Sequence, residues 1–127
     1  MKKCFCHHVH IVCSDLQPMI DFWVKVIGAE FVDYKEFGGA PGAVLDMDTV
    51  TKIYLKTMPC EPQPTPTRYA GTEHLGVIVE SLDATLATIS ATPGCKVIKE
   101  PFISGKLRCA FVTGPEGVLV EVMENMA

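Results

Sequence analysis

The sequence lacks the features that mark several common functional classes. It has no run of basic residues and carries a formal net charge of −4, which argues against a nucleic-acid-binding protein. No apolar stretch approaches the roughly 20 residues of a membrane-spanning helix. No apolar segment follows the first residues, MKKC, as it would in a signal peptide. We therefore expect a cytoplasmic protein that binds neither nucleic acids nor membranes.

A Cys-x-x-Cys motif is also absent, although the chain contains six cysteines. Several of them lie in apolar strand patterns, so we expect reduced and mostly buried thiols. Cys4, Cys6, His8 and His10 alternate along one predicted strand, which would suggest a soft-metal site. Four such residues span about 20 Å at about 3.3 Å per residue, so they cannot all bind one ion.

What the sequence does contain is an internal repeat. At an offset of 66 residues, His8 coincides with His74 and Gly28 with Gly94. One residue later, at an offset of 67, Tyr54 coincides with Glu121. A repeat at a fixed offset indicates two similar structural units, here each a strand, a helix and three more strands. The predicted strands are residues 5–13, 30–36, 43–48 and 51–58, then 74–80, 95–100, 107–113 and 117–124.

Helix signals separate the first strand of each unit from the other three. The segment SDLQPMIDFWVKVIG offers Ser14 or Asp15 as a cap, has an apolar stripe and ends at Gly28. In the second unit Leu82, Leu86 and Ile89 share one helix face. The glycines of FGGAPG are predicted to form a turn between strands, because no Gly-Lys-Ser/Thr follows to make a phosphate-binding loop.

These patterns predict an α+β fold made of two βαβββ modules with pseudo-twofold symmetry, forming a curved, cup-like mixed sheet. Module one covers about residues 4–58, a proline-rich linker about 59–71, and module two about 72–125. We expect a single domain over residues 1–127, because each module alone is too small for a stable core.

The repeat also predicts a metal site. Equivalent residues of two symmetric modules meet near their axis, so His8, His74, Tyr54 and Glu121 are expected to converge. Two imidazoles and one carboxylate leave coordination positions open, as in catalytic metal sites. We predict that His8, His74 and Glu121 bind one divalent metal ion, with Glu121 also catalytic. Alternatively, His74 is a hydrogen-bonded core histidine.

The other candidate residues have competing interpretations. Glu121 could form an ion pair with Arg108 on a neighbouring strand instead of binding a metal. Tyr54 is either a half-buried strand aromatic or a hydrogen-bonding partner of the substrate. His10 is either a rim residue or a general acid or base in the same cavity. His7 points to the opposite side and is expected at solvent or at a dimer surface.

Three segments carry a resemblance to a known family. HHVHIVCSDLQPMIDFWVKVIGAEFV, EHLGVIVESLDATLATI and FVTGPEGVLVEVME resemble the vicinal oxygen chelate superfamily of glyoxalases, methylmalonyl-CoA epimerases, extradiol dioxygenases, and fosfomycin and bleomycin resistance proteins. The resemblance implies paired βαβββ modules around a metal, commonly in a homodimer. It makes His8 the first-strand ligand, His74 the ligand that opens module two, and Glu121 the last-strand carboxylate. The ion would be Zn, Ni, Co, Mn or Fe.

The resemblance implies a glyoxalase-like lyase or isomerase that acts through a metal-chelated enediolate on a small substrate with vicinal oxygens. His10 or Tyr54 would move a proton or orient the substrate. Three positions depart from the family pattern. Tyr54 stands where glyoxalases carry Glu or Gln, Phe111 where extradiol dioxygenases carry Tyr, and His10 where fosfomycin enzymes carry Thr. The alternatives are therefore an iron-dependent ring-cleaving dioxygenase, a fosfomycin-type resistance enzyme, or a non-catalytic drug-binding protein.

Overall fold

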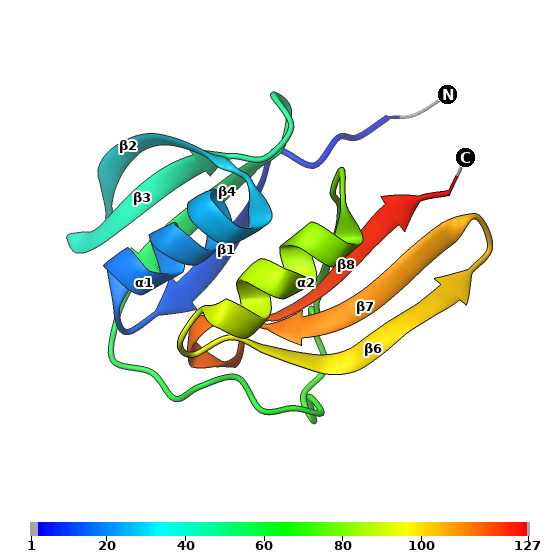
Figure 1. Ribbon diagram of the computed structural model, residues 1–127. Coiled ribbons are helices and arrows are strands. Elements are labelled where there is room, and N and C mark those ends of the chain that lie inside the picture. The colour runs from blue at the N-terminus through cyan, green and yellow to red at the C-terminus, as the bar shows by residue number, and fades with distance from the viewer. Residues whose placement is uncertain (1–2, 127) are drawn as a thin grey trace. The chain divides into compact units, whose positions relative to one another are not determined.

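A computed structural model describes residues 3–126, which form two compact units with the same order of elements (Figure 1). Unit 1 ends at Glu61 and unit 2 begins at Pro62, inside the proline-rich segment that was predicted as a linker. Within residues 3–126, no helix is long and apolar enough to cross a lipid bilayer.

Unit 1 is a four-stranded mixed sheet with a helix on one face (Figure 1). The strand order is β1-β4-β3-β2, with β1 parallel to β4 and the other pairs antiparallel. Its elements are β1 (His8–Cys13), α1 (Leu16–Asp21), the π-helix η1 (Phe22–Ile27), β2 (Glu30–Phe37), β3 (Ala40–Asp46) and β4 (Lys52–Thr57).

Unit 2 repeats this arrangement with the order β5-β8-β7-β6, in which β5 is parallel to β8. The predicted α+β fold of two βαβββ modules is therefore confirmed. The elements of unit 2 are β5 (Leu75–Ile78), α2 (Leu82–Ala91), β6 (Lys96–Ser104), β7 (Leu107–Thr113), the short 3-10 turn η2 (Pro115–Gly117) and β8 (Leu119–Asn125).

Several element boundaries differ from the prediction. Residues 5–7 are not part of β1. Strand β3 starts at Ala40, because Gly38 and Gly39 alone make the turn, with φ of +59° and +85°. Strand β6 continues past Pro101 to Ser104, which is possible because β6 is an edge strand and a proline there removes no ladder hydrogen bond.

The core of unit 1 lies between its helical segment and one face of its sheet. Met19, Phe22 and Trp23 are fully buried, and the strands contribute the buried side chains of Leu45 and Leu55. Gly28, with φ of +107°, ends η1 in a left-handed conformation that favours glycine. The apolar stripe read from the sequence is thus the stripe that covers the sheet.

Polar side chains from the sheet of unit 2 hold the start of α2. The carboxylate of Glu124 on β8 accepts a hydrogen bond from the backbone N–H of Leu82 at 2.8 Å. Ser81 caps the helix by accepting from the N–H of Ala84 at 3.2 Å. Arg108 on β7 forms an ion pair with Asp83 at 2.9 Å. Leu82 and Ile89 are buried on the sheet side of the helix.

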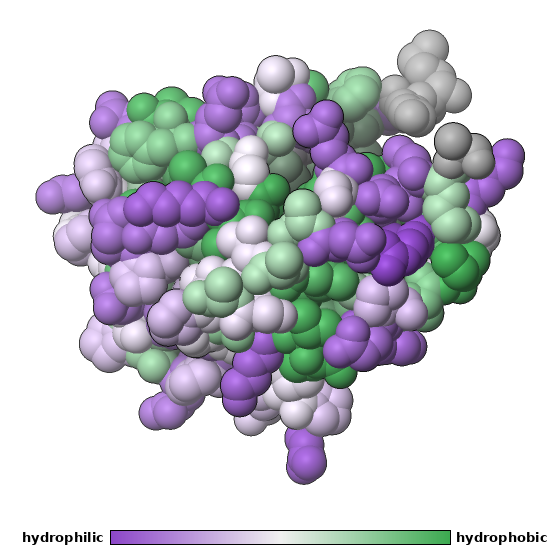
Figure 2. All heavy atoms as spheres, in the orientation of Figure 1, coloured by the Kyte–Doolittle hydropathy of each residue, from purple (hydrophilic) through white to green (hydrophobic). Residues whose placement is uncertain are grey.

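Each sheet has a second face that its own helix does not cover, called the open face here. Because side chains alternate along a strand, every second residue points to it. On β1 these are His8, His10 and Val12, which alternate with Val9, Ile11 and the buried Cys13. The molecular surface mixes hydrophilic and hydrophobic residues throughout the view in Figure 2.

All six cysteines lie in the described part of the chain, and none forms a disulfide. Cys13, Cys95 and Cys109 are buried, as predicted. Cys4, Cys6 and Cys60 are exposed, so the expectation of mostly buried thiols is wrong for half of them. The exposed three lie outside the regular strands, where no sheet packs over them.

Candidate functional site

Three predicted site residues meet on the open face of unit 1. Strands β1 and β4 are parallel neighbours, and their register places His10 directly beside Tyr54. The rings of His8 and Tyr54 are stacked, with centroids 4.2 Å apart and an interplanar angle of 15°. His10 contacts Tyr54 edge to face at 5.7 Å. Tyr54 is therefore a half-buried strand aromatic that also fixes the orientation of the His8 ring.

The other two predicted residues meet on the open face of unit 2. His74 directly precedes β5, and Glu121 on β8 lies beside Gly76. His74 Nε2 is 3.4 Å from Glu121 Oε1, and the side chains are 26% and 20% exposed. The alternative partner of Glu121, Arg108, points to the helix side, where it binds Asp83. The interpretation of Glu121 as an ion-pair partner of Arg108 is therefore wrong.

The residue before each site histidine contacts its Nδ1 atom. Glu73 Oε1 lies 3.0 Å from His74 Nδ1. His7 Nδ1 lies 2.9 Å from His8 Nδ1. His7 is exposed, but it faces its neighbour His8 rather than solvent alone. The repeat offset of 66 places His7 over Glu73, so the sequence contained this equivalence, although the two residue types differ.

The contact with Glu73 fixes the proton on the His74 ring. A carboxylate can only accept, so His74 Nδ1 carries the proton and donates it. In the neutral imidazole, Nε2 then presents a lone pair toward Glu121, which is itself an acceptor. A proton between the two atoms or a cation bound to both would remove the repulsion between these acceptors, which lie 3.4 Å apart.

This pair fits a metal ion. With metal–nitrogen and metal–oxygen bonds of about 2.1 Å, two tetrahedral ligand atoms lie about 3.4 Å apart. A histidine that binds a metal typically donates its other ring N–H to a carboxylate, as His74 does to Glu73. Within the described residues of either unit, however, no three His, Cys, Asp or Glu side chains are grouped to hold a metal.

Cys109 and Phe111 on β7 surround the pair from the adjacent strand. Phe111 lies beside Glu121 in the register and contacts the His74 ring edge to face at 5.1 Å. The pKa of the Cys109 thiol is raised by burial, by the negative charge of Glu121 and by a hydrogen bond to that carboxylate. Cys109 therefore stays a thiol that donates to Glu121 and helps to orient it.

His10 is suited to accept a proton. Desolvation lowers its pKa, and the positive charges of Lys56 and His8 lower it further. The ring is consequently neutral at pH 7, the state that a general base requires. His10 is exposed, and Phe37 contacts its ring at 4.6 Å, so it belongs to an aromatic cluster.

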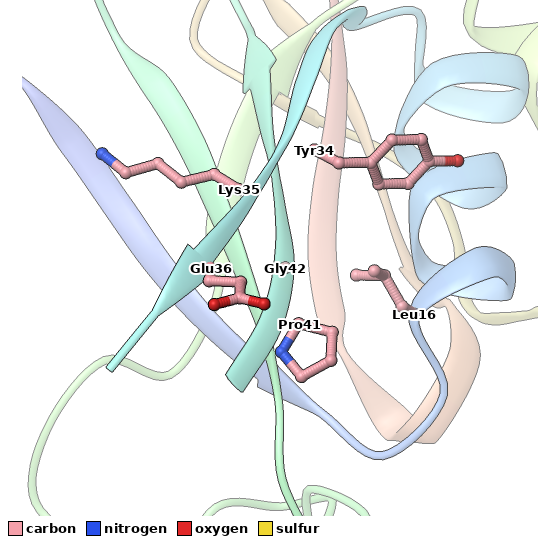
Figure 3. Close-up of a pocket in the computed structure, with 6 residues that line it drawn as sticks. All are labelled: Leu16, Tyr34, Lys35, Glu36, Pro41 and Gly42. Carbon is pink, nitrogen blue, oxygen red and sulfur yellow. The ribbon is translucent and has the colours of Figure 1, made fainter. Parts of the chain in front are cut away.

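A shallow pocket of about 310 Å³ lies on the helix side of unit 1, away from the histidines (Figure 3). Leu16, Tyr34 and Pro41 form its apolar part, and the Tyr34 hydroxyl lies 3.3 Å from the Gln17 side-chain oxygen. Figure 3 shows Lys35 extending away from this pocket, on the side of the strand opposite to Tyr34. None of the predicted site residues lines it.

Comparisons with known proteins agree with the geometry of the two units. The family model described as Glyoxalase/Bleomycin resistance protein/Dioxygenase superfamily matches residues 6–122. A search of curated proteins found no match.

Solved structures share the fold. A glyoxalase family protein from Bacillus cereus matches with a TM-score of 0.84 and 18% identity, covering 99% of this chain and 97% of that chain. A glyoxalase/dioxygenase from Nostoc punctiforme matches with a TM-score of 0.79 and 16% identity, covering 97% of this chain and 92% of that chain. An antibiotic-binding protein from a Streptomyces species matches with a TM-score of 0.71 and 16% identity, covering 98% of each chain. At these identities the likeness concerns the fold alone.

Proposed function

The chain belongs to the glyoxalase/bleomycin resistance protein/dioxygenase superfamily, and on that premise we propose that it is a metal-dependent, glyoxalase-type lyase or isomerase. Its substrate would be a small molecule with two adjacent oxygens. The observation that carries the proposal is the His74–Glu121 pair, with Nε2 and Oε1 separated by 3.4 Å and the other ring nitrogen held by Glu73.

The proposed ligands are His8, His74 and Glu121, which would hold one Zn, Ni, Co, Mn or Fe ion. The tautomer that Glu73 imposes on His74 supports this set, and the contact between His7 and His8 allows the same tautomer in unit 1. A bound divalent ion would polarise a substrate carbonyl and stabilise negative charge on its oxygen.

The remaining chemistry falls to residues of the open faces. His10, neutral at pH 7, would accept a proton from the substrate and return it. Tyr54 would hold His8 by stacking and offer its hydroxyl to the substrate. Glu121, oriented by the Cys109 thiol, would combine the roles of ligand and base.

The proposal includes the assembly that the site needs. We propose that the two units form a single domain and that the chain is a homodimer, the state commonly found in the superfamily. A dimer can place ligands from two copies around one ion as readily as a monomer can. Analytical ultracentrifugation of the wild-type protein with and without metal measures this directly.

The test is the metal content of purified protein beside His74→Ala and Glu121→Gln, after loading with each ion and dialysis. We expect close to one ion per chain in the wild type and loss in both variants. The control is Glu30→Gln, which changes an exposed carboxylate on β2 and should retain the metal. Wild-type protein that stays metal-free under every loading condition would contradict the proposal. Bound iron together with oxygen uptake on catechols would point to ring-cleaving dioxygenation instead.

A second candidate is a small-molecule binding protein without catalysis. It is favoured by the Streptomyces neighbour, which is an antibiotic-binding protein, and by the aromatic rings gathered around Tyr54. This candidate predicts ligand binding that a chelator does not change and no turnover. The fosfomycin-type alternative stays a prediction that thiol-transfer assays on fosfomycin would test.

A further inference from the structure

Two lysines lie on the open face of unit 1 beside aromatic rings. Lys35 Nζ is 5.3 Å from the centroid of the Phe37 ring and 5.6 Å from that of Tyr54. The Phe37 and Tyr54 rings are themselves 5.2 Å apart. Figure 3 shows that the Lys35 side chain leaves the helix side of the sheet. The ammonium group is thus placed over the same rings that surround the candidate site.

The second lysine completes a row across the sheet. Lys35 on β2 is paired with Gly42 on β3, and Gly42 is paired with Lys56 on β4. Gly42 has no side chain, and the Phe37 ring fills the space above it, because a Cβ there would lie 2.7 Å from Phe37 Cδ2. Across β2, β3 and β4 the open face therefore carries Lys35, the Phe37 ring and Lys56 in that order.

The open face of unit 1 carries three carboxylates, Glu30, Asp33 and Asp46, as well as Lys35, Lys52 and Lys56, and its lysines differ in whether a carboxylate contacts them. Asp46 is engaged by Lys52 at 3.4 Å, and Asp33 accepts a hydrogen bond from the Tyr34 N–H at 2.8 Å. Within residues 3–126, neither Lys35 nor Lys56 takes part in a salt bridge. Two unpaired ammonium groups next to flat apolar surfaces favour a ligand that carries both negative charge and a planar ring.

We propose that the open face of unit 1 binds a planar aromatic carboxylate, with the carboxylate at Lys35 and Lys56 and the ring against Phe37 and Tyr54. A simple inorganic anion would use the lysines and leave the rings uncovered. A neutral aromatic molecule would leave the two charges unmatched. As the substrate class of the enzyme, this inference rests on the proposed function, but binding to the face can be measured without any metal.

The test uses isothermal titration of the full-length, EDTA-dialysed protein with three probes. Salicylate is planar and anionic, salicylamide is planar and neutral, and cyclohexanecarboxylate is anionic but not aromatic. We expect salicylate to bind about tenfold more tightly than either of the others, a difference of about 1.4 kcal/mol. Equal binding of salicylate and salicylamide, or no binding of salicylate at millimolar concentration, would overturn the inference.

Variants locate the site. Lys35→Gln and Lys56→Gln should each weaken salicylate binding about threefold to tenfold, and Phe37→Leu should reduce the preference over cyclohexanecarboxylate. The matched control is Lys25→Gln, which removes an exposed helix lysine paired with Asp21. Unchanged affinity in both lysine variants would contradict the inference.

Metal content measured on the same samples separates the two proposals. Wild-type protein that binds salicylate but never holds a metal would refute the proposed function and support this inference. Lysine variants that keep the metal and lose salicylate would support both.

Discussion

The two units share a topology and differ in the chemistry of their open faces. His10 lies beside Tyr54 in unit 1, and Gly76 lies beside Glu121 at the equivalent register in unit 2. The open face of unit 1 thus places two histidine rings against Tyr54, whereas that of unit 2 places one histidine beside a carboxylate and against Phe111. The residues that pack against the helix determine the fold, so the side chains of the other face can differ between the two units. The candidate functional residues lie on that second face.

The largest expected difference between the units is at two glycines, Gly42 on β3 of unit 1 and Gly76 on β5 of unit 2. A Cβ at Gly42 would collide with the backbone oxygen of Leu55 and with the Phe37 ring. A Cβ at Gly76 would meet only the flexible end of Met123, at 2.9 Å. We expect Gly42→Ala to lower the free energy of unfolding by about 3 kcal/mol and Gly76→Ala by less than about 1 kcal/mol. Urea denaturation measures both, and equal losses would show that unit 1 relaxes around the added methyl.

The partners of the two histidines give the next difference. Glu73 presents a carboxylate to His74 and forms a charge-assisted hydrogen bond, whereas His7 presents a second imidazole to His8. We expect Glu73→Ala to weaken metal binding about 10- to 100-fold and His7→Ala by less than about tenfold. Competition with a chelating dye provides the affinities. An equal or larger effect of His7→Ala would reverse this ranking.

The units also differ in the contacts that hold each helix on its sheet, and the expected effect on stability is smaller. Helix α2 of unit 2 relies on polar contacts from its cap and from the sheet, while the helical segment of unit 1 relies on Trp23 and Phe22. We expect Ser81→Ala to lower the free energy of unfolding by about 1 kcal/mol, because the Ala84 N–H loses its acceptor. The control, Ser90→Ala on an exposed position of the same helix, should change it by less than about 0.5 kcal/mol. Equal losses of stability in the two variants would show that the Ser81 cap does not stabilise the helix.

The smallest expected effect is a pH dependence that arises from His10 of unit 1. The pKa of His10 is lowered from its ordinary value of 6.5, so the unfolded chain binds a proton more readily than the folded one. Stability therefore falls as the pH drops through about 6.5. Between pH 7.5 and 5.5, the melting temperature of metal-free His10→Gln should decrease less than that of the metal-free wild type. Parallel losses would assign the pH dependence to other groups.

Much of the fold could be predicted because it depends on local patterns. Alternation of apolar and polar residues predicted the strands, and an apolar stripe predicted the helix. The fixed repeat offset predicted the second unit. The boundaries that were wrong depend on less local effects. The strand beyond Pro101 exists because the chain there lies at a sheet edge, and β1 begins only at His8, the first residue in register with β4.

The candidate residues could be named from the sequence, but their partners could not. The repeat selected His8, His74, Tyr54 and Glu121, and their membership of the open faces follows from alternation along each strand. Which nitrogen of His74 is protonated depends on where the Glu73 side chain turns, and one-dimensional spacing does not contain that information. The same holds for Lys35, whose place over Tyr54 follows from the pairing of β2 with β3 and of β3 with β4.

The sequence by itself determined that this protein has two βαβββ modules and which side of each strand is apolar, because both follow from local periodicity and a single repeat offset. Only the tertiary structure decided the register, and with it that Arg108 turns to Asp83 and leaves Glu121 to His74. The physical reason is that a hydrogen bond or an ion pair acts over about 3 Å. Partners at that distance are set by how strands lie beside one another, not by their separation along the chain.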